Sequence, residues 1–64
     1  MTFTAKEKAD EAEREVKMRK QVYPNWVATG RLRDQTARTR IAIMEEIASE
    51  YRKQEEMEGM GKLL

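Results

Sequence analysis

Few residues in this sequence have the types and spacing that catalysis or metal binding requires. The carboxylates Glu45, Glu46 and Glu50 suggest a metal site or an acid/base pair. Carboxylate metal sites in helical bundles usually include histidine, however, and the chain contains none. Ser49 and Tyr51 have no general base beside them, which a nucleophile needs for activation. These side chains are better explained as a solvated helix face, so we predict a protein that is not an enzyme and that binds no metal or cofactor.

A faint likeness to a phosphate-binding loop lies near the C-terminal end, in the run Gly59-Met60-Gly61-Lys62. Such a loop lies between a strand and a helix. The residues that follow the lysine are too few for that helix, so we predict no nucleotide site here. We expect residues 58–64 to form a flexible tail instead.

Basic residues are concentrated in one part of the chain. Residues 14–40 contain eight basic side chains and two acidic ones, a net charge of +6, whereas residues 41–58 carry a net charge of −4. A basic surface can contact phosphates, although no recognised nucleic-acid motif accompanies this one. An accessory role on DNA or RNA is therefore an alternative function. The contacts that it would use are Arg31, Arg33, Arg38 and Arg40.

Length and composition limit what the chain can be. With 64 residues it forms one domain at most, and a chain this short often needs partners to be stable. Cysteine is absent, which excludes disulfides and fits a reducing, cytoplasmic compartment. No apolar run is long enough for a membrane span or a signal peptide, so we expect no membrane contact. The charged fraction is 39% and the aromatic fraction only 6%. The composition, rich in Ala, Glu, Lys, Arg, Met and Ile, is typical of long helices or coiled coils.

The stretch from Val22 to Gly30 contains the only tryptophan and the only proline of the chain. Pro24 disfavours a helical conformation for the residue before it, so a helix arriving from the N-terminal side should end near Tyr23. Residues 25–29 can then form one short helical turn, which Gly30 would stop in the left-handed conformation. Trp26 could stack on a ligand. We assign it to a hydrophobic core between two helices, because one aromatic residue beside such a corner is ordinary packing.

Two long helices are predicted on either side of this corner. Thr4 and Glu7 form a capping box at the start of a helix over residues 5–23, and a second helix is predicted over residues 34–57 from its apolar spacing. The predicted fold is all-α. It is an antiparallel helical hairpin of a long helix, a one-turn corner helix and a second long helix, in one domain over residues 1–57. Its core anchors would be Tyr23, Trp26, Val27, Leu32, Ile41, Met44 and Tyr51.

The apolar surface of the second predicted helix is too wide for one neighbour. Ile43 and Ile47 widen it to about 160° at 100° per residue, and the first helix is too rich in alanine to cover such an arc. A hairpin would also gather basic residues at its corner and acidic residues at its open end. We therefore predict self-association through Ile43 and Ile47, as an antiparallel dimer that completes a four-helix bundle.

Two runs, within roughly residues 9–54, carry a resemblance to a known group of proteins: Glu13-Arg14-Glu15-Val16-x-Met18-Arg19-x-x-Val22-Tyr23-Pro24-x-Trp26-Val27-x-x-Gly30-Arg31-Leu32, and Ile41-Ala42-Ile43-Met44-Glu45-x-Ile47-Ala48-x-x-Tyr51-Arg52. The chain resembles small uncharacterised proteins encoded by phages and prophages of proteobacteria, most specifically at the corner. The resemblance implies a phage or prophage origin, the cytoplasm of a bacterial host, and no particular activity. We expect a small non-catalytic protein that acts through helix–helix contacts, with itself or with a host or phage protein. An inhibitor of a host enzyme or defence complex is a further alternative.

Overall fold

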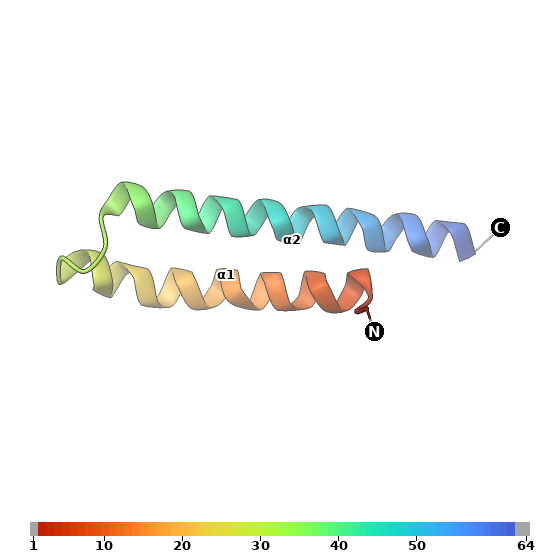
Figure 1. Ribbon diagram of the computed structural model, residues 1–64, viewed down its shortest axis with the longest axis horizontal. Helices are drawn as coiled ribbons and strands as arrows, with labels where there is room; N and C mark the ends of the chain where they lie inside the picture. Colours follow the sequence, from red (N-terminus) through yellow and green to blue (C-terminus); the bar gives the residue numbers. More distant parts are fainter. Residues whose placement is uncertain (1, 63–64) are drawn as a thin grey trace.

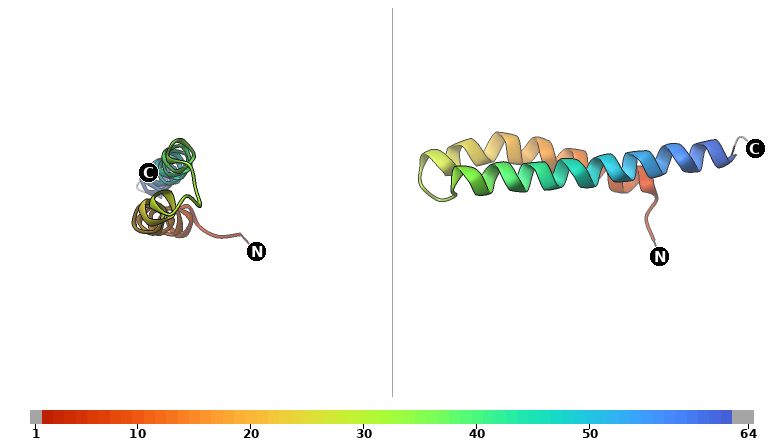
Figure 2. Two further views of the ribbon diagram at one scale, coloured as in Figure 1. Left: turned by 90° about the vertical axis from the view of Figure 1, so that its left-hand side faces the viewer. Right: turned by 90° about the horizontal axis from the view of Figure 1, so that it is seen from above.

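Two long helices packed side by side make up the described part of the molecule (Figures 1 and 2). The computed structural model describes residues 2–62, with side chains through residue 59. Helix α1 spans Ala5–Ala28, helix α2 spans Asp34–Lys62, and a short loop turns the chain back between them. Residues 2–62 contain no strand, and the hairpin measures 52 × 20 × 17 Å. The predicted all-α antiparallel helical hairpin is confirmed.

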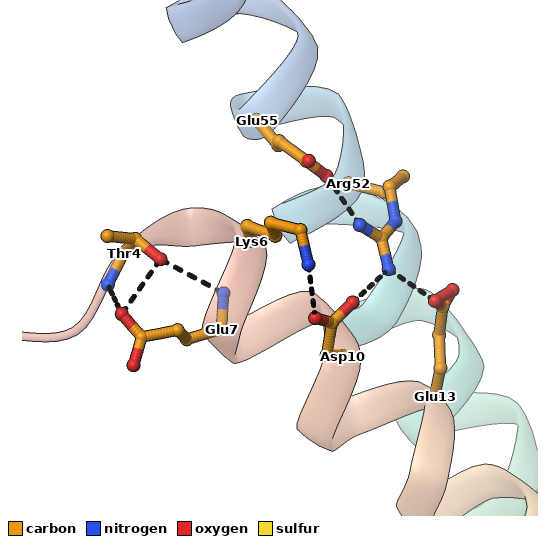
Figure 3. Close-up of polar contacts among 7 residues, drawn as sticks. All are labelled: Thr4, Lys6, Glu7, Asp10, Glu13, Arg52 and Glu55. Atoms are coloured by element: carbon orange, nitrogen blue, oxygen red, sulfur yellow. Dashed lines mark hydrogen bonds and ion pairs between the residues drawn. The ribbon is translucent and has the colours of Figure 1, made fainter.

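The first turn of α1 is fixed by the capping box that the sequence predicts (Figure 3). The N–H of Glu7 donates to Oγ1 of Thr4 at 3.1 Å, and the N–H of Thr4 donates to Oε1 of Glu7 at 3.2 Å. Thr4 has extended backbone angles, φ −72° and ψ 160°, as residues that cap a helix N-terminus do. The helix therefore begins at Ala5, as predicted.

Helix α1 does not end before Pro24, which corrects the prediction of a separate one-turn corner helix. The helix continues through Pro24 to Ala28. The proline has no N–H to donate to the carbonyl of Lys20, so this turn lacks one backbone hydrogen bond. Its fixed φ is compatible with a helix, and its ring is exposed at a shallow hollow beside the start of α2. The missing bond is therefore tolerated, and the residues after Pro24 form the last turn of α1.

The end of α1 is fixed by a Schellman motif around Gly30. The N–H of Arg31 donates to the carbonyl of Trp26 at 2.8 Å, and the N–H of Gly30 donates to the carbonyl of Val27 at 3.1 Å. Gly30 has a φ of +77°, in the left-handed region that glycine adopts without the steric cost of a side chain. The prediction that Gly30 stops a helix is confirmed, and the helix that it stops is α1 itself.

Helix α2 is longer than the sequence predicts. The carbonyl of Arg33 accepts its first hydrogen bond, from the N–H of Ala37 at 2.9 Å, and the carboxylate of Asp34 lies in the first turn, where it complements the helix dipole. The helix passes the expected end at Met57 and continues to Lys62. A glycine within a helix costs about 1 kcal/mol and does not by itself end it. Residues 58–62 of the expected tail are thus helical, whereas residues 63 and 64 lie outside the described residues.

The two helices meet along a seam of mostly small residues. No large side chain in the described part of the chain is fully buried. Alanine lets two helices approach closely but removes little apolar area from water. The hairpin is therefore closely packed along one line and has no enclosed interior. The buried residues of this seam are Ala5, Ala9, Ala12, Val16, Tyr23, Ala37 and Ala48.

The predicted core anchors are only partly enclosed. Tyr23 is buried, with 8% of its surface exposed. Trp26 is not a core residue, which corrects the prediction, because 36% of its surface is exposed and its ring stacks on Tyr23 with the centroids 5.6 Å apart. Two helices meet along a line, so residues beside that line remain accessible to solvent. The other predicted anchors are half-buried: Val27, Leu32, Ile41, Met44 and Tyr51.

Candidate functional site

A polar groove runs between the helices on one side of the hairpin. Its walls come from both helices, and most of its lining residues are charged. Lys20 and Glu45 face each other across it, with Nζ and Oε2 3.4 Å apart. Both side chains remain about half exposed, so this pair contributes little to stability. The residues that line the polar groove are Glu13, Val16, Lys17, Lys20, Glu45, Ala48, Ser49, Arg52, Lys53 and Glu56.

Arg52 joins the two helices near the open end of the hairpin (Figure 3). Its Nη2 lies 2.9 Å from Oδ1 of Asp10 and also contacts Glu13, while its Nη1 lies 2.5 Å from Oε2 of Glu55. Hydrogen bonds to these carboxylates, to Asp10 first, raise the pKa of Arg52. A hydrogen bond from Lys6, helped by one from Arg52, lowers the pKa of Asp10 below its ordinary value of 3.8. One guanidinium on α2 thus holds two carboxylates of α1 and fixes how the helices align.

Two different contacts between the helices mark the opposite side of the hairpin. Nη1 of Arg19 donates to the backbone carbonyl of Arg40 at 2.9 Å, and Oε1 of Glu15 holds the same guanidinium through Nε at 2.9 Å. The ammonium of Lys8 lies 5.2 Å from the centre of the Tyr51 ring, in a cation–π contact. The flank of α1 that carries Lys8 and Arg19 therefore lies beside the flank of α2 that carries Arg40 and Tyr51.

Apolar side chains of α1 follow the first of these flanks. Met18, Val22 and Trp26 recur at every fourth position, which places them in one stripe along the helix. They line a shallow hollow together with Glu15, Arg19 and Tyr23. Because Arg19 contacts Arg40 of α2, this stripe lies on the side away from the polar groove.

Apolar side chains of α2 follow the same side of the hairpin. Ile43, Ile47 and Tyr51 also recur at every fourth position, and Tyr51 lies under Lys8 of α1. On the other flank of α2, Glu45, Ser49 and Arg52 face the polar groove instead. The two isoleucines of α2 and the apolar stripe of α1 therefore share one side of the molecule.

We call this surface the apolar face and define it as Met18, Val22, Trp26, Ile43 and Ile47. Met18 exposes 50% of its surface and Ile43 exposes 51%, whereas Val22 and Ile47 are half-buried. Grouped exposed apolar side chains make this side of the hairpin the candidate interaction surface. The sequence-based prediction of a self-association surface contained the isoleucines but not the residues of α1. Their four-residue spacing is visible in the sequence, but the register that joins them to the isoleucines is not.

The four arginines predicted to contact nucleic acid do not come together in one face. All four are exposed, and Arg31 and Arg33 lie in the loop between the helices. Arg38 and Arg40 are two residues apart on α2, so at about 100° per residue they point to nearly opposite sides. Nε of Arg38 also lies 2.8 Å from Oδ2 of Asp34. The basic corner thus surrounds the end of the hairpin and forms no single strip for a phosphate backbone.

Within residues 2–62, no group of three or more acidic, histidine or cysteine residues is placed to hold a metal ion. Neither helix, over its described residues, is long and apolar enough to cross a membrane. No protein-family model, no curated protein and no solved structure matches the chain. A functional proposal therefore rests on the geometry of the hairpin.

Proposed function

We propose that this protein is a small non-catalytic interaction module that acts through helix–helix contacts made by its apolar face. The observation that carries the proposal is the one-sided placement of exposed apolar side chains. Met18 and Ile43, on different helices, each leave half of their surface in water. The contact of Arg19 with Arg40 places their flanks on the same side of the hairpin. An apolar stripe on a helix is normally covered by another element, because burial removes it from water. A helix or a pair of helices from a partner would cover this face.

The residues on the other side of the hairpin support the same choice of surface. Arg52 holds Asp10 and Glu13, and Lys20 faces Glu45, so four of the charged residues that line the polar groove are already paired within the chain. A partner seated in the groove would have to displace or desolvate these pairs, which costs free energy. The apolar face has no charge to desolvate at Met18 and Ile43 themselves, and one ion pair, Glu15 with Arg19, borders it. The phage or prophage origin implied by the resemblance at the corner belongs to this proposal, with a phage or host protein, or a second copy, as the partner.

Affinity capture with matched variants tests the proposal. The tagged chain would be co-expressed with an untagged copy and captured from a bacterial lysate after nuclease treatment. The double variant Ile43→Glu with Ile47→Glu places two charges on the apolar face. Ala42→Glu with Ser49→Glu places the same two charges at exposed positions on other faces of the same helix. We expect the native chain and the Ala42/Ser49 variant to retain a protein partner, and the Ile43/Ile47 variant to lose it.

Two results would contradict the proposal. The first is a partner that the Ile43/Ile47 variant retains as well as the native chain does, which would place the contact elsewhere. The second is capture that disappears on nuclease treatment, which would favour the basic corner and a nucleic-acid ligand.

A further inference from the structure

We propose that the occupant of the apolar face is a second copy of this chain, related to the first by a two-fold axis that sets the two hairpins head to tail. The inference rests on the proposed function and names its partner. In this dimer the apolar faces of both copies are buried against each other, and four helices surround one core. A two-fold axis makes this possible with a single self-complementary surface.

One long side of the hairpin, part of which is the apolar face, is large enough for such a dimer. The hairpin is 52 Å long and 20 Å wide, so one long side offers a flat area of about 1,000 Å². A standard specific interface buries roughly 800 Å² on each partner. The seam of the single hairpin is mostly alanine, and no large side chain in its described part is fully buried. Pairing two copies would enclose Met18 and Ile43, which the single hairpin leaves half exposed.

The distribution of charge selects the relative orientation. The corner half of the hairpin, residues 16–44, has seven basic residues and one acidic residue, a net charge of +6. The open half, residues 5–15 and 45–58, has five basic and eleven acidic residues, a net charge of −6. Head-to-tail packing places each corner beside the partner's open half, whereas head-to-head packing places like charges together. Exposed charges interact weakly and are screened by salt, so burial of the apolar face holds the dimer and charge sets its direction.

The position of Trp26 gives the two orientations different contacts. Trp26 lies in the last turn of α1, at the corner end of the apolar face, and Ile47 lies farther along α2 than Ile43, at the end nearer the open half. Head to tail, the corner end of one face lies over the far end of the other, so Trp26 faces the middle of the partner hairpin. Head to head, the two tryptophans lie close together. Only the first arrangement covers Ile47 of one copy with the tryptophan end of the other.

Sedimentation equilibrium of the purified native chain tests whether the partner is a second copy. We expect a mass of twice 7.6 kDa from low to high micromolar concentration, in both low and high salt. The double variant Ile43→Glu with Ile47→Glu should sediment as a monomer, and the matched variant Ala42→Glu with Ser49→Glu should remain a dimer. Met18→Glu changes the other helix at an exposed position and should weaken the dimer at least tenfold. This variant tests whether the dimer forms through the apolar face even if circular dichroism shows that the isoleucine variant does not fold.

Spin labels measure the orientation in the native-like dimer. The chain has no cysteine, so Gln54→Cys gives a single labelling position on the exposed surface of α2. Head-to-tail packing puts the two labels on opposite ends of the bundle, roughly 30–40 Å apart at a rise of 1.5 Å per residue. Head-to-head packing puts them within about 20 Å, because packed helices lie 8–10 Å apart. The longer distance supports the proposed axis, and the shorter one overturns it.

The outcomes separate this inference from the proposed function. If the native chain stays monomeric at high micromolar concentration, the inference that the partner is a second copy is wrong. If it nevertheless captures another protein through the apolar face, the proposed function stands without the dimer. A dimer that both double variants disrupt equally would contradict the choice of face and with it the proposed function.

Discussion

Alanine at position 9 offers the sharpest test of how the hairpin is packed. Ala9 is completely buried in the seam between α1 and α2, with 0% of its surface exposed. The two helices can approach this closely because the side chain is small. The neighbouring Lys8 contacts the ring of Tyr51, so an aromatic side chain of α2 lies at this level of the seam. Replacing Ala9 with leucine adds three carbon atoms where the helices leave no room. We expect Ala9→Leu to push the helices apart and to destabilise the fold.

The expected magnitude follows from the kind of change. Overpacking a close-packed seam typically costs about 1–3 kcal/mol. For a domain of this length, each kcal/mol lowers the Tm by roughly 4–8 °C, so the loss should be about 4–24 °C. Leucine is nearly as good a helix former as alanine, so helix propensity does not account for a loss of this size. Thermal unfolding followed by circular dichroism measures it, at one fixed protein concentration because association shifts the Tm.

Ala42→Leu is the matched control. Ala42 is exposed on α2, so the same substitution there adds the same atoms without touching the seam. Its Tm should stay within about 3 °C of the native value, as surface substitutions of this kind change stability by about 0.5 kcal/mol. If Ala9→Leu melts at or above the temperature of Ala42→Leu, the helices are not held at alanine spacing, and the packing argued for the seam is wrong.

Three further predictions concern other parts of the hairpin. Gly30→Ala should cost roughly 1–2 kcal/mol in urea unfolding, because its φ of +77° is unfavourable for alanine although the space around it is open; Gly30→Asn should cost less. Tyr23→Ala should lower the free energy of unfolding more than Trp26→Ala does, since Tyr23 is 8% exposed and Trp26 is 36% exposed. The reverse order would show that Trp26 is the more important core residue. Lys6 and Arg52 lower the pKa of Asp10, so Asp10 stabilises the fold fully above its ordinary pKa of 3.8 and loses this effect as the pH falls below it. Asp10→Asn should therefore melt below the native chain at neutral pH, with the difference closing in acid; an unchanged difference would exclude this linkage.

The parts of the fold that the sequence predicts correctly depend on neighbours within a few residues. Thr4 and Glu7 are three positions apart and form the capping box by themselves. Gly30 stops α1 because its own backbone takes the left-handed conformation. The apolar spacing of α2 places Ile43 and Ile47 on one flank. Each of these features is local, so residue type and spacing are enough to predict it.

The errors at the corner arise where local preference competes with longer-range structure. Pro24 disfavours the helix locally, yet α1 passes through it, because the turn loses only one hydrogen bond and the Schellman motif fixes the residues after it. The extension of the helix carries Trp26 onto the flank rather than into the seam. Tyr23 is left as the aromatic residue of the core.

The candidate site was decided only by the tertiary structure. Arg52 meets Asp10 and Glu13 across 42 and 39 positions of sequence, and their meeting fixes the register of the two helices. That register sets Met18 of α1 and Ile43 of α2 on the same side. The sequence determines which residues of each helix form a stripe, because helical periodicity is a property of one chain segment. It does not determine which stripes of two helices combine into one surface, because that depends on how the helices are rotated and aligned when their side chains pack together.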